Sequence, residues 1–238
     1  MNYLDLEVLQ NIQSEEFLNT KPFPWVNPKG SIRAEKFDLL RKSFPDISLF
    51  TKSYGVKRAH GQKPHDRWEL LMREGIPLSP EWQEFTAEIR SGSYRKELER
   101  IFGTREFTVR YWWQLATTGA SVSPHSDSAK KLGTQIFYFN SSEDWKEEWG
   151  GRTIILDDEG KFSDQSAPEI HAFPRKYEAQ ILDNRSLIFM RTPHAWHAVQ
   201  ELAAPEGAYR KLFTVILDCK PSVLRRILRR LGVERAYF

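Results

Sequence analysis

The hydrophobic pattern of this chain changes near residue 106, and that change limits the possible folds more than any other feature. Phe107, Val109, Tyr111, Trp113 and Leu115 occupy alternate positions, which is typical of a strand with one buried face. A strand follows the turn at 117–119, and further candidate strands lie at 134–140, 152–156, 177–182, 186–190, 196–200 and 209–217. About eight short strands after a helical first half predict an α+β fold with a double-stranded β-helix (jelly-roll) core.

The first part of the chain shows helical spacing instead. Apolar residues fall on one face of a segment at 33–44, which predicts an amphipathic helix. Two more helices are expected behind Ser79 and Ser93, because serine caps helix starts and a glycine follows each segment. Residues 46–66 are less regular and predict a loop with one strand at 49–54.

We expect a single domain over residues 1–238, built from three parts. Residues 1–105 form a mainly helical support region, 106–219 form the catalytic jelly-roll core, and 220–238 form a basic C-terminal helix. The tail sequence SVLRRILRRLGV separates apolar residues from arginines on opposite helix faces. Packing of the apolar face on the core is the favoured interpretation, ahead of docking on an acidic partner or on an anionic membrane surface.

Composition excludes several classes of protein. Of the 238 residues, 40% are hydrophobic and 28% charged, as in a soluble globular protein. The net charge of +3 is too small to indicate nucleic-acid binding over the whole surface. We find neither a segment apolar enough to span a membrane nor a secretory signal. The single cysteine, Cys219, permits no intramolecular disulfide and indicates the reducing cytoplasm.

A short motif, Pro124-His125-Ser126-Asp127, carries the strongest chemical signal. Side chains two apart on a strand point to the same face, so His125 and Asp127 can bind one ion. His197, from a distant strand, would complete two histidines and one carboxylate, the arrangement of non-haem Fe(II) oxygenases. Alone, the His-x-Asp pattern is weak and fits a structural interpretation better; the ordered set of motifs around it strengthens the metal site.

The distal ligand has two candidates, His194 and His197. His194 follows Pro193, which sits poorly in a central strand. We therefore favour His197 and expect His194 beside the ligands or at the start of the strand. Downstream, Arg210 and Thr214 share one strand face, so a guanidinium and a hydroxyl can both hydrogen-bond one carboxylate.

These motifs together resemble the prolyl 4-hydroxylase-like branch of the Fe(II)- and 2-oxoglutarate-dependent dioxygenases, whose core is cupin-like. The resemblance covers roughly residues 106–217, about half of the chain. The proximal metal motif, the strand with Tyr138, the pair Gly150-Gly151 and the distal His197 occur in the family's order. The loop from His197 to Arg210 is longer than in the shortest family members, and residues 1–105 carry no family motif.

The resemblance implies an enzyme that hydroxylates an unactivated C–H bond and releases succinate and CO2. Fe(II) would be held by His125, Asp127 and His197, and the far carboxylate of 2-oxoglutarate by Arg210 with Thr214 and Tyr138. Ascorbate is a candidate addition. The substrate, a peptide with or without proline or a small molecule, is left open, as is the oligomeric state; no nucleic-acid partner is expected.

Two other classes of function use the same features. A non-catalytic jelly-roll module would bind a ligand without converting it. A zinc hydrolase would use the same three ligands, but the carboxylate-binding Arg210 would have no function in it.

Several remaining residues fit structural roles. Tyr138, without the resemblance, would be a core residue with a satisfied hydroxyl. Trp112–Trp113 favour core packing over a pocket wall, and Lys211 points away from Arg210 toward solvent. Three histidines lie in polar surroundings and are expected on the surface: His60, His65 and His171.

Overall fold

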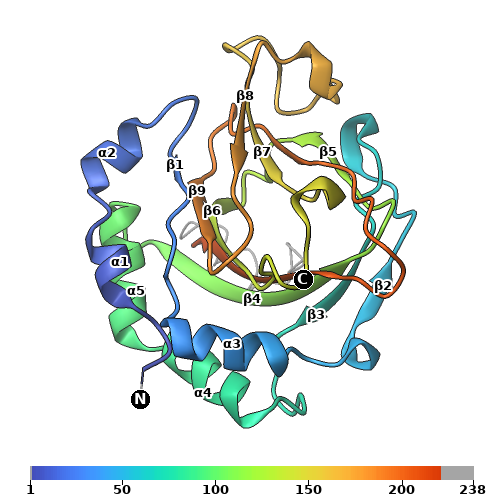
Figure 1. The fold of residues 1–238 in the computed structure, drawn as a ribbon. Helices are drawn as coiled ribbons and strands as arrows, with labels where there is room; N and C mark the ends of the chain where they lie inside the picture. The colour runs from blue at the N-terminus through green and yellow to red at the C-terminus, as the bar shows by residue number, and fades with distance from the viewer. Residues whose placement is uncertain (1, 221–238) are drawn as a thin grey trace, which may run out of the picture.

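Two antiparallel sheets face each other in the computed structural model, which describes residues 2–220 (Figure 1). The larger has seven strands in the order β1-β9-β6-β11-β4-β3-β2, and the smaller has four in the order β5-β10-β7-β8. The strands are β1 (Trp25–Val26), β2 (Thr51–Ser53), β3 (Arg67–Leu71), β4 (Phe107–Ala116), β5 (Val122–His125), β6 (Lys131–Tyr138), β7 (Thr153–Asp157), β8 (Arg175–Ala179), β9 (Ser186–Met190), β10 (His197–Val199) and β11 (Arg210–Cys219). The expected α+β fold with a jelly-roll core is confirmed.

The helices lie on the outer face of the larger sheet (Figure 1). They are α1 (Leu6–Gln10), α2 (Ser14–Asn19), α3 (Ala34–Lys42), α4 (Pro80–Ile89) and α5 (Gly92–Ile101), with short 3-10 turns η1 (Ile47–Leu49), η2 (Ala59–Gly61), η3 (Glu147–Trp149) and η4 (Ile170–Ala172). The structure confirms the three helices expected from their apolar faces. Ser79 caps α4 as expected, but α5 begins behind Ser91, not Ser93, because α4 ends at Ile89 and the chain turns at once.

Strand β11 lies at the centre of the larger sheet and is buried on both faces. Phe213, Val215 and Leu217 belong to the core shared with the helices, whereas Arg210, Leu212, Thr214 and Ile216 line the space between the sheets. The outer core is aromatic: Trp82 of α4 lies fully buried, 5.5 Å from Trp113 and 5.6 Å from Phe213 between ring centroids. The alternation read from the sequence therefore separates a helix-facing side from a cavity-facing side.

Residues before 106 also contribute strands to the larger sheet. The strand expected at 49–54 is β2, but β1 and β3 were not predicted. β1 has only two residues and depends on pairing with β9, while β3 pairs with β4 and β2. Neither has a clear alternation of its own, so partner strands define them.

Part of the expected organisation lies outside the described residues. The basic C-terminal helix at 220–238 falls there except for its first residue. Within the described part, none of the helices has the length and apolarity needed to cross a membrane.

The contact of α5 with strand β6 leads to a stability prediction. A Cβ on Gly133 would lie 2.3 Å from Phe102 Cε1 and 2.5 Å from the Phe189 carbonyl oxygen. Gly133→Ala should lower the free energy of unfolding by about 1–3 kcal/mol through overpacking. Gly92→Ala is the control, because nothing lies within 4 Å of that position; it should be neutral or stabilising by about 0.4–1 kcal/mol. Equal urea midpoints for the two variants would contradict this packing.

Candidate metal centre

A cavity of about 360 Å³ lies between the two sheets. Strands β4, β6 and β11 form one wall, and β5, β7 and β10 form the other. Polar side chains gather along it while the outer face of the larger sheet is apolar. This cavity is where the residues predicted from the sequence meet.

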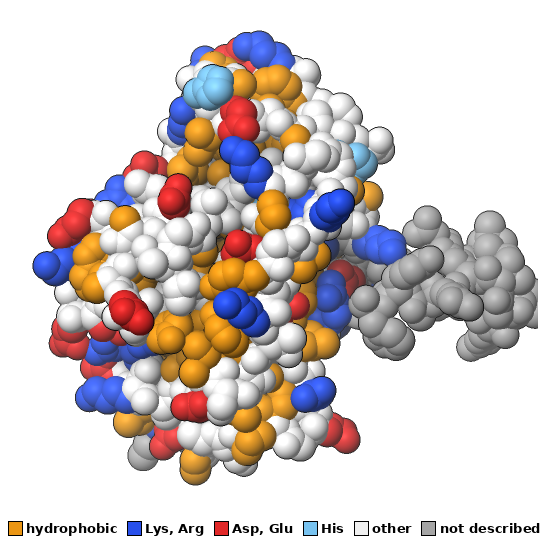
Figure 2. Space-filling model, turned by 90° about the vertical axis from the view of Figure 1, so that its right-hand side faces the viewer, with side chains coloured by type: hydrophobic (Ala, Val, Ile, Leu, Met, Phe, Trp, Pro, Cys, Tyr) orange, Lys and Arg blue, Asp and Glu red, His pale blue; other side chains and the backbone are white. Residues whose placement is uncertain are grey.

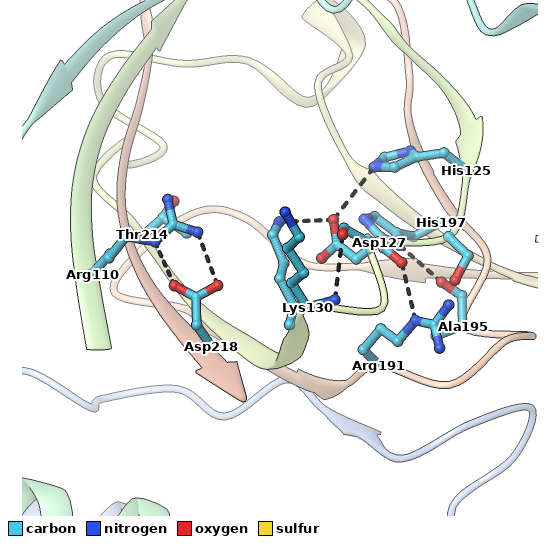
Figure 3. A network of polar contacts seen from close by, with 12 residues as sticks. Arg110, His125, Asp127, Lys130, Arg191, Ala195, His197, Thr214 and Asp218 are labelled. Atoms are coloured by element: carbon cyan, nitrogen blue, oxygen red, sulfur yellow. Dashed lines mark hydrogen bonds and ion pairs between the residues drawn. The ribbon is translucent and has the colours of Figure 1, made fainter. Parts of the chain in front are cut away.

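The structure brings His125, Asp127 and His197 together, with one ligand atom of each within 4.8 Å of the others. His125 and His197 are cross-strand partners on β5 and β10, and their ring centroids are 4.2 Å apart. His125 Nε2 lies 3.9 Å from Asp127 Oδ1. Figure 3 shows the three side chains turned toward one another.

Asp127 reaches this point by a different route from the one expected. β5 ends at His125, so His125 and Asp127 do not share one strand face. The Ser126 hydroxyl donates to the Thr192 carbonyl, and Arg191 Nε donates to the Asp127 carbonyl, at 2.9 and 3.0 Å. These bonds hold the segment against the β9–β10 connection instead of continuing the ladder.

The hydrogen bonds of the two histidines fix which ring nitrogen faces the centre. His125 Nδ1 lies 3.0 Å from the Ser123 carbonyl oxygen, and His197 Nδ1 lies 3.0 Å from that of Ala195. A carbonyl only accepts, so Nδ1 carries the proton and Nε2 keeps its lone pair for a metal. Burial lowers the pKa of both histidines, most strongly that of His125, so both are neutral at pH 7.

Asp127 is kept ionised by its neighbours. Burial raises the pKa of its carboxyl group, but Lys131 and then the two histidines lower it by more, so the net shift is downward. Lys131 Nζ lies 2.8 Å from Oδ1. A metal that takes one carboxylate oxygen can leave the other to Lys131, a residue that the sequence did not single out.

The alternative distal histidine, His194, lies outside this cluster. Its side chain is 45% exposed, and its Nδ1 is 2.9 Å from Asp158 Oδ2. It precedes β10, as expected of a residue at the start of the strand.

Arg210 lies in the same cavity and is only 5% exposed. Its Nη2 donates to Thr153 Oγ1 at 3.2 Å, and the Tyr138 hydroxyl is 2.9 Å from the same oxygen. Its Nε is buried without a hydrogen-bond partner. Burial lowers the pKa of Arg210, which Tyr138 opposes, and no carboxylate lies within salt-bridge distance in residues 2–220.

The hydroxyl next to Arg210 belongs to Thr153, not to Thr214. Thr214 also lines the cavity, but its hydroxyl donates to Gln114 Oε1 at 3.4 Å. Four residues along a strand correspond to roughly 13 Å, so the shared face does not bring Thr214 into contact with the guanidinium. Thr153 follows the glycine pair directly, which is the signal that could have found it.

The pair Gly150-Gly151 lets the backbone approach its neighbours closely. A Cβ on Gly151, at φ +81°, would lie 2.9 Å from Arg210 Cδ, and one on Gly150 would lie 2.3 Å from the Glu201 carbonyl oxygen. Glycine at 151 therefore makes room for the Arg210 side chain.

Two of the structural interpretations need correction. His65 is buried, not on the surface: its ring centroid lies 4.6 Å from that of His125, and it lines the cavity. Burial and then the charges of Arg58 and Arg67 lower its pKa to about 3. Lys211 does point away from Arg210, but it is three-quarters buried and its Nζ lies 3.1 Å from Asp144. Both depend on contacts distant in sequence.

The tryptophan pair divides between the two roles considered. Trp113 is fully buried in the core against the helices, while Trp112 lines the cavity. Adjacent residues on a strand point to opposite faces, so both interpretations hold, one for each residue.

Comparisons with solved structures place this fold among Fe(II)- and 2-oxoglutarate-dependent oxygenases. A prolyl hydroxylase from Trichoplax adhaerens, in complex with a hypoxia inducible factor oxygen degradation domain peptide fragment, has a TM-score of 0.62 at 12% identity, over 95% of this chain and 93% of that one. A Pseudomonas putida prolyl-4-hydroxylase has a TM-score of 0.60 at 11% identity, over 87% and 97%. The alpha-ketoglutarate-dependent carbocyclase SnoK from nogalamycin biosynthesis has a TM-score of 0.59 at 10% identity, over 94% and 92%.

This chain has the fold of the prolyl 4-hydroxylase-like oxygenases. The expected fold is thereby confirmed from coordinates. No protein-family model matches the chain, and no curated protein matches it in sequence.

Metal binding should depend on His197 and not on His194. His197→Ala removes a ligand atom and should weaken Mn(II) binding by more than about 100-fold, beyond the effect of losing a supporting residue. His194→Ala should leave the Kd within a few-fold, since its partner is Asp158. Isothermal titration calorimetry of both variants checks this, and a larger loss in His194→Ala would contradict the assignment.

Proposed function

We propose that this protein is an Fe(II)- and 2-oxoglutarate-dependent oxygenase that hydroxylates a C–H bond and releases succinate and CO2. One observation carries the proposal. The same cavity holds two neutral histidines with a carboxylate and, apart from them, a buried guanidinium without an anionic partner. The first set suits a divalent metal and the second suits a dicarboxylate.

The chemistry of the three side chains fits Fe(II). Two imidazoles and one carboxylate on one side of an ion leave coordination positions open, as non-haem iron oxygenases require. We propose His125, Asp127 and His197 as the ligands, with Arg191 and Lys131 fixing the Asp127 segment. When bound, the metal with the 2-oxo acid supplies activation of dioxygen.

Arg210 fits the far carboxylate of 2-oxoglutarate. A guanidinium offers a planar fork of donors that matches a carboxylate, and leaving it buried without an anion is unfavourable. The Thr153 and Tyr138 hydroxyls lie beside it and can add hydrogen bonds. We propose Thr214 as part of the wall between Arg210 and the metal, because it lines the cavity four residues along β11.

Hydroxylation of a peptide or small-molecule substrate is the finer part of the proposal. The structural neighbours include a prolyl hydroxylase with a bound peptide fragment and a carbocyclase, and fold alone does not select among such outcomes. A need for ascorbate is a further prediction. Scoring succinate release over a panel of peptides and small molecules would identify the substrate.

A zinc hydrolase with the same ligands is the competing function. Arg210 disfavours it, because such an enzyme has no use for a buried cation that can bind a second carboxylate. Binding of 2-oxoglutarate separates the two functions directly.

Anaerobic protein with Fe(II) and 2-oxoglutarate should develop a weak visible charge-transfer band. Asp127→Ala should abolish it. Arg210→Ala should weaken 2-oxoglutarate binding by about 10–100-fold, the loss of a charged hydrogen bond, with little change in metal affinity. Arg175→Ala, at an exposed strand position, is the control. Unchanged 2-oxoglutarate affinity in Arg210→Ala would refute the assignment of this residue.

Gly151→Ala should also weaken 2-oxoglutarate binding, because the new methyl group would displace the Arg210 side chain. Gly160→Ala is matched to it: φ is +76° there, so the backbone strain is similar, but nothing lies within 4 Å. Calorimetric titration of 2-oxoglutarate into both Mn(II)-loaded variants is the measurement. Equal affinities would mean that Gly151 does not position Arg210.

A further inference from the structure

The cavity that holds the metal centre is lined by more cations than anions. Its charged lining comprises two carboxylates, from Asp66 and Asp127, and five cationic side chains: Arg58, Arg67, Arg110, Lys131 and Arg210. The three histidines of the wall have lowered pKa values, chiefly through burial, and are neutral at pH 7. Fe(II) and doubly charged 2-oxoglutarate cancel each other, so loading the proposed site leaves this excess.

Three of the five cations already have carboxylate partners. Arg67 Nε lies 2.9 Å from Glu69 Oε2, and Lys131 Nζ lies 2.8 Å from Asp127 Oδ1. Arg110 donates to both carboxylate oxygens of Asp218 (Figure 3). Arg210 is the residue proposed for 2-oxoglutarate, which leaves Arg58.

Arg58 lies in the loop between β2 and β3 and is half-buried. Its Nε donates to Gln62 Oε1 at 3.2 Å. Its two terminal nitrogens have no hydrogen-bond partner, and no carboxylate lies within 4 Å, in the part of the chain that the structure describes. A guanidinium in this state can form a bidentate pair with an incoming anion.

The charge of Arg58 acts on the metal centre and not on Arg210. Burial and then Arg67 lower the pKa of Arg58, while Asp127 opposes them. The same charge lowers the pKa of His65 and His197. The pKa of Arg210 is shifted instead by its burial and by Tyr138. The two guanidinium groups without carboxylates therefore serve different parts of one cavity.

We propose that Arg58 binds an anionic group, a carboxylate or a phosphate, of the substrate that is oxidised at the metal centre. The proposal rests on the function proposed above and adds the substrate class to it. His65, whose ring touches that of His125, and Trp112, which lies 5.6 Å from the Arg67 guanidinium, form the wall for the neutral part of the substrate.

Neither the rest of the surface nor Asp66 accounts for Arg58. On the face seen in Figure 2, basic and acidic side chains are interspersed, so a continuous basic field does not extend over that face. Asp66 accepts a hydrogen bond from the Gly55 N–H at 2.8 Å and is not among the charges that shift the pKa of Arg58. The free guanidinium is a feature of the cavity.

The test measures binding of two probes, inorganic phosphate and acetate, to protein loaded with Mn(II) and saturating 2-oxoglutarate. Arg58→Ala should weaken binding of the preferred probe by about tenfold or more, the loss of a charged hydrogen bond. Arg58→Lys should retain part of it, because the charge remains without the fork. Lys57→Ala is the matched control: Lys57 is exposed on the same loop and does not line the cavity, so its affinities should equal those of the wild type.

The outcomes separate this proposal from the proposed function. Binding of 2-oxoglutarate is measured in the same samples and should stay within twofold in Arg58→Ala. Equal probe affinities in wild type and Arg58→Ala, equal losses in Arg58→Ala and Lys57→Ala, or no probe binding by the wild type would overturn the role of Arg58. A wild type that binds the probes at Arg58 but fails to bind 2-oxoglutarate would instead count against the oxygenase function. The preferred probe distinguishes a carboxylate from a phosphate substrate.

Discussion

The rest of the structure depends on β11, a strand whose two faces carry opposite kinds of side chain. Phe213, Val215 and Leu217 pack among the helices, while Arg210 and Thr214 face the cavity. Burying an aromatic side chain such as Phe213 stabilises the fold by about 1.5–3 kcal/mol. A one-residue slip in register would exchange the faces, so the apolar core that holds the helices also fixes where the cavity arginine points.

The second constraint is electrostatic. The fold buries Arg210 without an anion and supports it only with the Thr153 hydroxyl and the Tyr138 ring. An arginine in this state is unfavourable in the free protein and becomes favourable when a carboxylate arrives. The same reasoning applies to Arg58 at the metal centre, where partial exposure makes the penalty smaller. Binding of anions, more than stability, explains both residues.

Sequence patterns predicted much of the core because their physical basis is local. Alternation along β4 and capping of α4 by Ser79 need only neighbouring residues. The order of the metal motif, the glycine pair, His197 and Arg210 indicated a single site. In contrast, Thr153 and His65 were missed, because they become neighbours of Arg210 and His125 only after strands far apart in sequence pair.

By itself, the sequence determined which faces of the elements are apolar, where helices give way to strands, and which residue types can bind a metal and a carboxylate. These properties depend on side-chain chemistry and on the repeat of each element. Only the tertiary structure decided that Asp127 arrives from outside its strand, that Thr153 and not Thr214 contacts Arg210, and that Arg58 lacks an anion. The physical reason is that contact, burial and charge pairing are set by packing between distant segments, which no local repeat specifies.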